Sequence, residues 1–174
     1  CPPVFAAVKV HSETISQLPV HLYRRLDQGK ERAPKHPAAR LLKNPNAWTT
    51  GVDFRKQAMV DICLHGNAYC WIGRNTKQEP VELRRIDPTA VTIETKESGE
   101  PAYKVTTKNG AQKVYPFTEI LHFKGPSKDG LKGESPVEVG KKAIALAMTL
   151  ENYALNLFEN GARPSGVIET KSNL

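Results

Sequence analysis

The chain has 174 residues, of which 39% are hydrophobic, and a formal net charge of +7 at pH 7. This length allows one domain, or one domain with an appendage, and no run of about 18 apolar residues is present to span a bilayer. Three cysteines are too few for a disulfide framework. Because the sequence starts at Cys1 without a methionine and stops just after an expected strand, we expect it to be part of a longer polypeptide.

The positive charge favours a polyanionic partner, but only weakly. No single basic run has the form of a nucleic-acid-binding arm, so the preferred explanation of the charge is the solvated surface of a fragment whose missing parts rebalance it. The basic clusters are dispersed along the chain at Arg24-Arg25, residues 30–35, Arg84-Arg85, residues 124–132 and Lys141-Lys142.

The first part of the sequence has mainly helical periodicity. A first helix is predicted over residues 5–18, with Val4, Ala7, Val8, Ile15 and Leu18 near one face. Caps and breakers bound the elements that follow. These are a strand over residues 20–24, a helix over 36–43, a helix that starts after Thr49 or Thr50 and ends at Gly66-Asn67, and a strand over 68–72.

Beyond residue 72 the period of the pattern changes from about 3.6 to 2, which indicates strands. Asn109-Gly110, between two alternating segments, is a strong hairpin signal. Helices followed by a block of strands and then one long helix are typical of the α+β class, not of a wound parallel sheet. The predicted strands cover residues 81–86, 91–95, 103–107, 114–115 and 120–123.

The C-terminal part contains the most informative element, a long helix predicted as continuous over residues 135–160. Ser135 is suited to the N-cap, Pro136 to the first helical position and Glu138 to a capping box, whereas Asn160-Gly161 ends the helix. The middle of this helix, residues 143–148, is apolar on every face. Such a helix must be covered on all sides, and one small domain covers only one side. We therefore expect another chain to cover the rest.

Catalytic chemistry finds little support in the sequence. The loop Gly125–Gly133 resembles a phosphate loop, but its lysine does not adjoin the second glycine and no Ser or Thr follows it. Asp61 and His65 lie one helical turn apart and are predicted to be a surface pair. Cys63 and Cys70 lack the spacing of a zinc site and are predicted to be buried free thiols. We therefore predict no enzyme activity, no catalytic residues, no cofactor and no metal.

In order and spacing, the sequence resembles the portal (head-to-tail connector) proteins of tailed bacteriophages, in the branch found in siphophages and prophages. None of the shared motifs is diagnostic alone. The shared stretches are residues 12–23, His36-Pro37, Leu41-Leu42, Asn44-Pro45-Asn46, Phe54-Arg55, residues 66–69, residues 83–88, residues 120–123, Gly130, Gly133, Ser135-Pro136 and Asn160-Gly161-Ala162.

The resemblance implies an α+β body like a portal wing over residues 1–125, a connector loop and stem-like helix over 126–160, and the start of a clip-like segment over 161–174. It implies a homo-oligomeric ring, usually a dodecamer, at one vertex of the capsid, assembled in the bacterial cytoplasm. Double-stranded DNA passes through such a ring without sequence preference. The implied protein partners are the terminase large subunit, the major capsid or scaffold protein and the head-tail adaptor, and no membrane is implied.

Two sets of residues follow from this interpretation. Ile144, Leu146 and Met148 are the candidate subunit-interface residues of the long helix, and Lys141 and Lys142 are candidate DNA-channel contacts. The alternatives are a nucleotide-dependent factor that uses the Gly125–Gly133 loop and a nucleic-acid-binding module that uses the basic surface.

Overall fold

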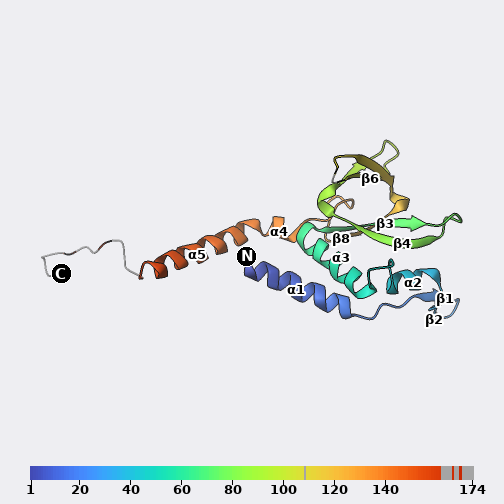
Figure 1. Ribbon diagram of the computed structural model, residues 1–174, viewed down its shortest axis with the longest axis horizontal. Helices are drawn as coiled ribbons and strands as arrows, with labels where there is room; N and C mark the ends of the chain where they lie inside the picture. Colours follow the sequence, from blue (N-terminus) through green and yellow to red (C-terminus); the bar gives the residue numbers. More distant parts are fainter. Residues whose placement is uncertain (108, 162–165, 167–168, 170–174) are drawn as a thin grey trace. The chain divides into compact units, whose positions relative to one another are not determined.

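A computed structural model of the chain describes residues 1–107, 109–161, 166 and 169. The chain divides into two compact units, one formed by Pro2–Val139 and the other by Gly140–Leu174 with Cys1. The α-helices are α1 (Pro2–Gln17), α2 (Pro37–Lys43), α3 (Gly51–His65), α4 (Pro136–Val139) and α5 (Lys141–Glu159) (Figure 1). The strands are β1 (Tyr23–Arg25), β2 (Lys30–Arg32), β3 (Asn67–Arg74), β4 (Pro80–Ile86), β5 (Val91–Thr95), β6 (Pro101–Thr106), β7 (Gln112–Pro116) and β8 (Ile120–Lys124). Two short 3-10 turns, η1 (Pro88–Ala90) and η2 (Phe117–Glu119), precede β5 and β8.

The strand pairs of the described residues are all antiparallel and form three small sheets. These have the strand orders β1-β2, β4-β3-β8 and β5-β6-β7. In the central sheet, Cys70 of β3 lies opposite Arg85 of β4 and Leu121 of β8. Helices and antiparallel sheets are segregated along the chain, so the predicted α+β class is confirmed.

The local signals of the sequence fix the ends of several elements. Thr50 is the N-cap of α3, where its Oγ1 accepts a hydrogen bond from the Asp53 N–H at 3.1 Å. Gly66 ends α3 in the left-handed conformation with φ +75°. The hairpin between β6 and β7 turns at Asn109-Gly110, with Gly110 at φ +79°. These three predictions are confirmed.

Two hydrophobic clusters hold the Pro2–Val139 unit together. The first joins α2 and α3 to the central sheet and contains Leu41, Phe54, Cys70 and Leu83. The second joins the central sheet to the β5-β6-β7 sheet and contains Tyr69, Tyr103 and Ile120. Because Cys70 and Tyr69 are neighbours on β3, they point to opposite faces of the sheet. Strand β3 is therefore covered on both sides.

Helix α1 packs along α3 through a face that its apolar residues predict only in part (Figure 1). The residues of α1 that are buried are Ser12 and Ser16, whereas Ile15 and Leu18 are exposed. Serine is small, and its hydroxyl returns to the helix backbone, as the bond from Ser16 Oγ to the Glu13 carbonyl shows. The prediction for this face is right for Val4 and Val8, which are half-buried in line with the two serines, and wrong for Ala7, Ile15 and Leu18. Small residues lie where the two helices approach closely.

The strand expected over residues 20–24 is also displaced, since β1 covers Tyr23–Arg25. Its pairing with β2 continues only to Leu22, whose carbonyl accepts a hydrogen bond from the Ala33 N–H at 2.9 Å. The residues before Leu22 belong to the connection from α1.

Candidate functional site

Helix α5 presents an apolar surface that the described residues leave open. None of its 19 residues is buried, and Leu146, Tyr153 and Phe158 are 61%, 65% and 71% exposed. Exposed large apolar side chains that form a contiguous patch mark interaction sites in soluble proteins. The helix therefore has the character of an assembly surface.

The large apolar side chains of α5 gather on two opposite faces, because an α-helix has about 3.6 residues per turn, and on one flank Ala143, Ala147, Ala154 and Phe158 join these faces. One face carries Leu146, Leu150, Tyr153 and Leu157, and the opposite face carries Ile144, Met148 and Leu155. Glu151 lies at the edge of the second face. A helix with two apolar faces is suited to contact two neighbours at once.

A polar strip separates the two faces along one side of the helix. Lys142, Thr149 and Asn156 lie along it, with Lys141 and Asn152 beside them. Both lysines are exposed and stand in the first turn of α5. The structure thus places Lys141 and Lys142 together at the N-terminal end of this strip, whereas Leu146 and Met148 belong to opposite apolar faces.

The predicted continuous helix over residues 135–160 is wrong in one respect. The Glu138 N–H donates to Ser135 Oγ at 3.2 Å, which confirms the N-cap, but α4 ends at Val139 and α5 begins at Lys141. Gly140 interrupts the helix with φ −85° and ψ 1°. Glycine weakens a helix interior by roughly 1 kcal/mol relative to alanine, which explains why the break falls at this residue.

The connector that leads into α4 is bound to the body by the side chain of Asn67. Asn67 is 1% exposed, and its amide forms two hydrogen bonds with the backbone of Gly133: the Gly133 N–H donates to Oδ1 at 2.7 Å, and Nδ2 donates to the Gly133 carbonyl at 2.8 Å. A Cβ on Gly133 would lie 2.1 Å from the carbonyl oxygen of Gly66. Only glycine permits this close approach of the two backbones.

Asn67 also joins a buried histidine that sequence reasoning missed. Its Oδ1 is 3.0 Å from Nε2 of His122, and Nδ1 of His122 is 3.2 Å from the Tyr103 hydroxyl. The imidazole stacks on Tyr69 with a centroid distance of 4.4 Å. Since Asn67 Oδ1 has only lone pairs to offer, Nε2 carries the proton and Nδ1 accepts from Tyr103.

This environment keeps His122 neutral. Burial, together with a smaller effect of the nearby charge of Lys124, lowers the pKa of His122 from 6.5 to about 4. Because His122 links β8 to β6 and to the connector, its role is to hold these segments in place. In the sequence, His122 was recognisable only as a histidine within an apolar strand, which does not predict its partners.

Asp61 does not pair with His65, contrary to the prediction of a surface pair. Its carboxylate is 2% exposed and accepts two hydrogen bonds from Arg85, at 2.6 Å from Nε and 2.7 Å from Nη2. Gln57 adds a third bond at 3.2 Å. The arrangement is a structural ion pair between α3 and β4, in the geometry that arginine and carboxylate prefer.

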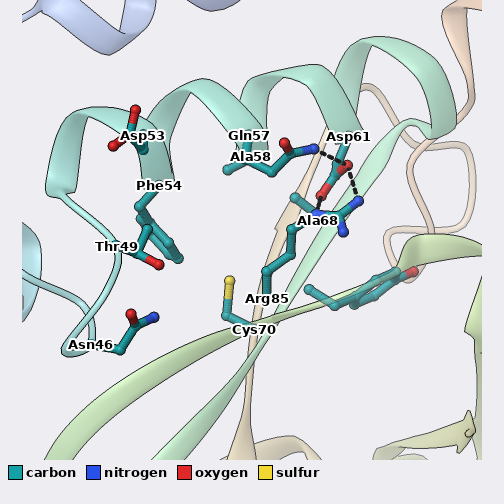
Figure 2. A pocket seen from close by; sticks show the side chains of 11 residues that line it. Asn46, Thr49, Asp53, Phe54, Gln57, Ala58, Asp61, Ala68, Cys70 and Arg85 are labelled. Carbon is teal, nitrogen blue, oxygen red and sulfur yellow. Dashed lines mark hydrogen bonds and ion pairs between the residues drawn. The ribbon is translucent and has the colours of Figure 1, made fainter.

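Beside this ion pair lies a cavity of about 230 Å³ between α3 and the central sheet, shown in Figure 2. The Cys70 thiol and Phe54 line it together with Arg85. Burial raises the pKa of the Cys70 thiol to about 12, so the thiol stays protonated and unreactive. Cys63 is half-buried rather than buried, and its pKa is also raised by burial.

The loop Gly125–Gly133 is folded around its own carboxylate. The N–H groups of Leu131 and Lys132 donate to Asp129 Oδ1 at 2.8 and 2.9 Å, and Ser127 Oγ donates to the same oxygen at 2.9 Å. These bonds lower the pKa of Asp129 to about 2. A phosphate in this loop would compete with a fixed negative charge for the same donors, so the geometry opposes nucleotide binding.

In the described part of the chain, no group of three or more His, Cys, Asp or Glu side chains is placed to hold a metal ion. Among the same residues, no helix combines the length and the apolar character needed to cross a bilayer.

Comparison with known proteins identifies relatives along nearly the whole chain. It is 27% identical over 171 residues to the portal protein of Enterobacteria phage HK97, covering 96% of this chain and 40% of that protein. It is 28% identical over 186 residues to the probable portal protein of Streptomyces phage phiC31, covering 98% and 39%. The chain thus spans about two fifths of the length of these curated relatives.

Solved structures give the same result. A chain in the neck of an empty gene transfer agent particle, computed with C6 symmetry, superposes with a TM-score of 0.78 at 26% identity, covering 95% of this chain and 45% of that one. An HK97-family portal protein from Corynebacterium diphtheriae shares the fold, with a TM-score of 0.64 at 18% identity over 99% of this chain and 53% of that one. The family model described as "Phage portal protein" matches residues 2–174, so this chain belongs to the phage portal protein family.

Proposed function

We propose that the protein is a structural subunit of a phage portal ring at one vertex of the virion, and that the ring is a conduit for DNA during packaging and ejection. The family match over residues 2–174 carries this proposal. The relatives' names and the particle necks in which similar chains stand support the same location. In this role the chain itself performs no bond chemistry. We further propose assembly in the cytoplasm of the bacterial host.

The two apolar faces of α5 support a ring. In a closed ring each subunit has two neighbours and uses two different surfaces to contact them. The face with Leu146, Leu150 and Tyr153 would meet one neighbour, and the face with Met148 and Leu155 the other. We propose twelve subunits, as the resemblance implies.

The proposed assignment of the three segments of the chain follows from the family resemblance. Residues 1–125 form the wing-like body, and residues 126–160 form the connector and stem-like segment. Residues 161–174 begin a clip-like segment, most of which lies outside the described residues. The proposed protein partners are the terminase large subunit, the major capsid or scaffold protein and the head-tail adaptor.

For DNA, we propose contacts from the polar strip of α5, with Lys141 and Lys142 at its start. Contacts to phosphates are electrostatic and independent of sequence, which suits DNA that must slide. Binding should therefore be weak and should fall with rising salt. A titration of two unrelated duplexes at two salt concentrations tests this. A strong preference for one duplex, or nanomolar affinity at high salt, would contradict it.

The ring itself is tested by the mass of the full-length protein in solution, with Leu146→Asp as the perturbation. An unpaired carboxylate buried in an interface costs several kcal/mol, and every contact in the ring would carry this cost. Wild-type protein should form rings, and the Leu146→Asp variant should remain in smaller species.

The matched control is Asn152→Asp, which adds the same charge to the same helix beside the polar strip. This variant should assemble as the wild type does. Normal rings from Leu146→Asp, or equal loss of assembly in both variants, would refute the assignment of this face. ATP hydrolysis by the full-length protein would instead support the nucleotide-dependent alternative.

A further inference from the structure

The Pro2–Val139 unit contains a groove that is part of neither the apolar faces nor the polar strip of α5. It lies between the connection from α1 to β1, the C-terminal end of α2 and the first turn of α3. Its volume is about 720 Å³, within the roughly 300–1,000 Å³ of typical ligand pockets. The groove is thus large enough to hold several side chains of a partner.

The groove belongs to the segment that carries most of the positive charge of the protein. Residues 19–56 contain nine lysines and arginines and three acidic residues, which gives +6 of the chain's net +7. Arg32, Lys43 and Arg55 line the groove, and none of its lining residues is acidic. Within the described residues, no carboxylate lies within ion-pair distance of these three cations.

Arg55 is only partly used by the protein's own fold. Its Nη2 donates to the Ser16 carbonyl at 2.8 Å, which ties α3 to the end of α1. Its buried Nε has no hydrogen-bond partner among the described residues. The charge of this guanidinium therefore remains uncompensated at the wall of the groove, where an anionic group would lower the electrostatic energy.

Most of the other side chains in the lining are aliphatic, and the polar ones among them are His21, Asn44 and Thr50. Val20, Leu22, Leu42 and Val52 contribute to it together with prolines and alanine. The lining contains no Phe, Tyr or Trp and a single imidazole, that of His21, whereas binding of single-stranded nucleic acid relies on a series of rings on which successive bases stack. A duplex offers phosphates but no apolar groups to fill such a surface. The combination of cations and aliphatic side chains fits a polypeptide that carries both carboxylates and apolar side chains.

We propose that this groove is a docking site for an acidic segment of a partner polypeptide, whose carboxylates meet Arg32, Lys43 and Arg55 while its apolar side chains fill the aliphatic lining. The site does not depend on the ring, because all its lining residues lie in one subunit and in one compact unit.

The test uses the 174-residue chain labelled with nitrogen-15 and an unlabelled, end-capped decapeptide that alternates Asp or Glu with Leu. Chemical-shift changes should be confined to residues 19–56. A second peptide, with every Leu replaced by Ser, keeps the charge and should bind about fivefold or more weakly, because it lacks the apolar contacts. Shifts spread over the surface, or equal binding of both peptides, would overturn the proposal.

The charge requirement is tested with the double variant Arg32→Glu, Lys43→Glu, which should lower affinity about tenfold or more. The matched control is Lys77→Glu, Lys96→Glu, which makes the same charge change at exposed positions elsewhere and should change affinity less than about twofold. Circular dichroism checks that both variants fold. Equal weakening in the two variants would refute the site.

Two further outcomes would also overturn the proposal. If a short DNA duplex displaces the peptide from the groove at equal salt, the groove is a nucleic-acid site. If groove resonances shift on dilution of the protein alone and the sedimentation coefficient falls with them, a second copy of this chain occupies it.

Discussion

Replacing Asn67 by alanine should detach the connector from the body and destabilise the Pro2–Val139 unit. Truncation leaves the buried N–H and carbonyl of Gly133 without partners, and each unsatisfied buried group costs about 1–3 kcal/mol. The bonds to the His65 carbonyl and to His122 are lost as well. We expect the free energy of unfolding to fall by about 4 kcal/mol, a large part of the 5–15 kcal/mol typical of a domain.

Two measurements check this expectation. Urea unfolding followed by tryptophan fluorescence reports on this unit, because Trp48 and Trp71 both belong to it. Hydrogen exchange should show faster exchange at residues 125–135 in the variant, while the β5-β6-β7 sheet keeps its protection. Asn152→Ala, an exposed asparagine on α5, is the control and should change stability by less than about 0.5 kcal/mol. A loss below about 1 kcal/mol for Asn67→Ala, or unchanged exchange at residues 125–135, would refute the reasoning.

Two further predictions concern the buried ionisable groups. Because folding lowers the pKa of His122 from 6.5 to about 4, its contribution to stability is complete above about pH 6.5 and is lost as the pH falls toward 4. Stability should therefore drop by about 2 kcal/mol more between pH 7.5 and pH 5 in the wild type than in His122→Gln, and equal pH profiles in urea unfolding would contradict this. Arg85→Met should cost about 3–5 kcal/mol, because it leaves the buried Asp61 unpaired, and adding Asp61→Leu should recover part of this loss. A double variant less stable than the single one would disprove the account of this ion pair.

Local signals were sufficient to predict much of the fold. Thr50, Gly66 and Ser135 end or begin helices through contacts with residues at most four positions away. Asn109-Gly110 favours a hairpin because asparagine and glycine readily adopt the positive φ angles of tight hairpin turns. Such features depend on a few neighbouring residues, so one sequence is enough to identify them. The break at Gly140 was missed because a single glycine is also tolerated inside helices.

The contacts that fix the connector could not be predicted in this way. Asn67 meets His122 and Gly133 across 55 and 66 positions, and Arg85 meets Asp61 across 24. No spacing rule relates residues so far apart, and Asp61 with His65 looked like a pair only because helical periodicity relates them. The tertiary fold offered Asp61 a guanidinium with two donors in the right geometry. Asp61 therefore pairs with Arg85 and not with His65.

Which of the cations have a carboxylate partner also depends on tertiary contacts, so the sequence alone does not reveal it. Along the sequence the basic clusters look alike, and a solvated surface is the preferred explanation over a polyanionic partner. In the structure, several cations have carboxylate partners of their own. These pairs are Lys56 with Glu13, Arg84 with Glu82, Arg85 with Asp61, Lys104 with Glu94 and Lys128 with Glu134.

The cations of the groove differ from these, because the described residues supply no carboxylate to Arg32, Lys43 or Arg55. A paired charge is largely neutralised within the protein, whereas an unpaired charge projects its field into solvent and attracts a counterion or a partner. The net charge of the chain is therefore a poor guide to binding. The number of unpaired cations that converge on one concave, partly aliphatic surface is a better one.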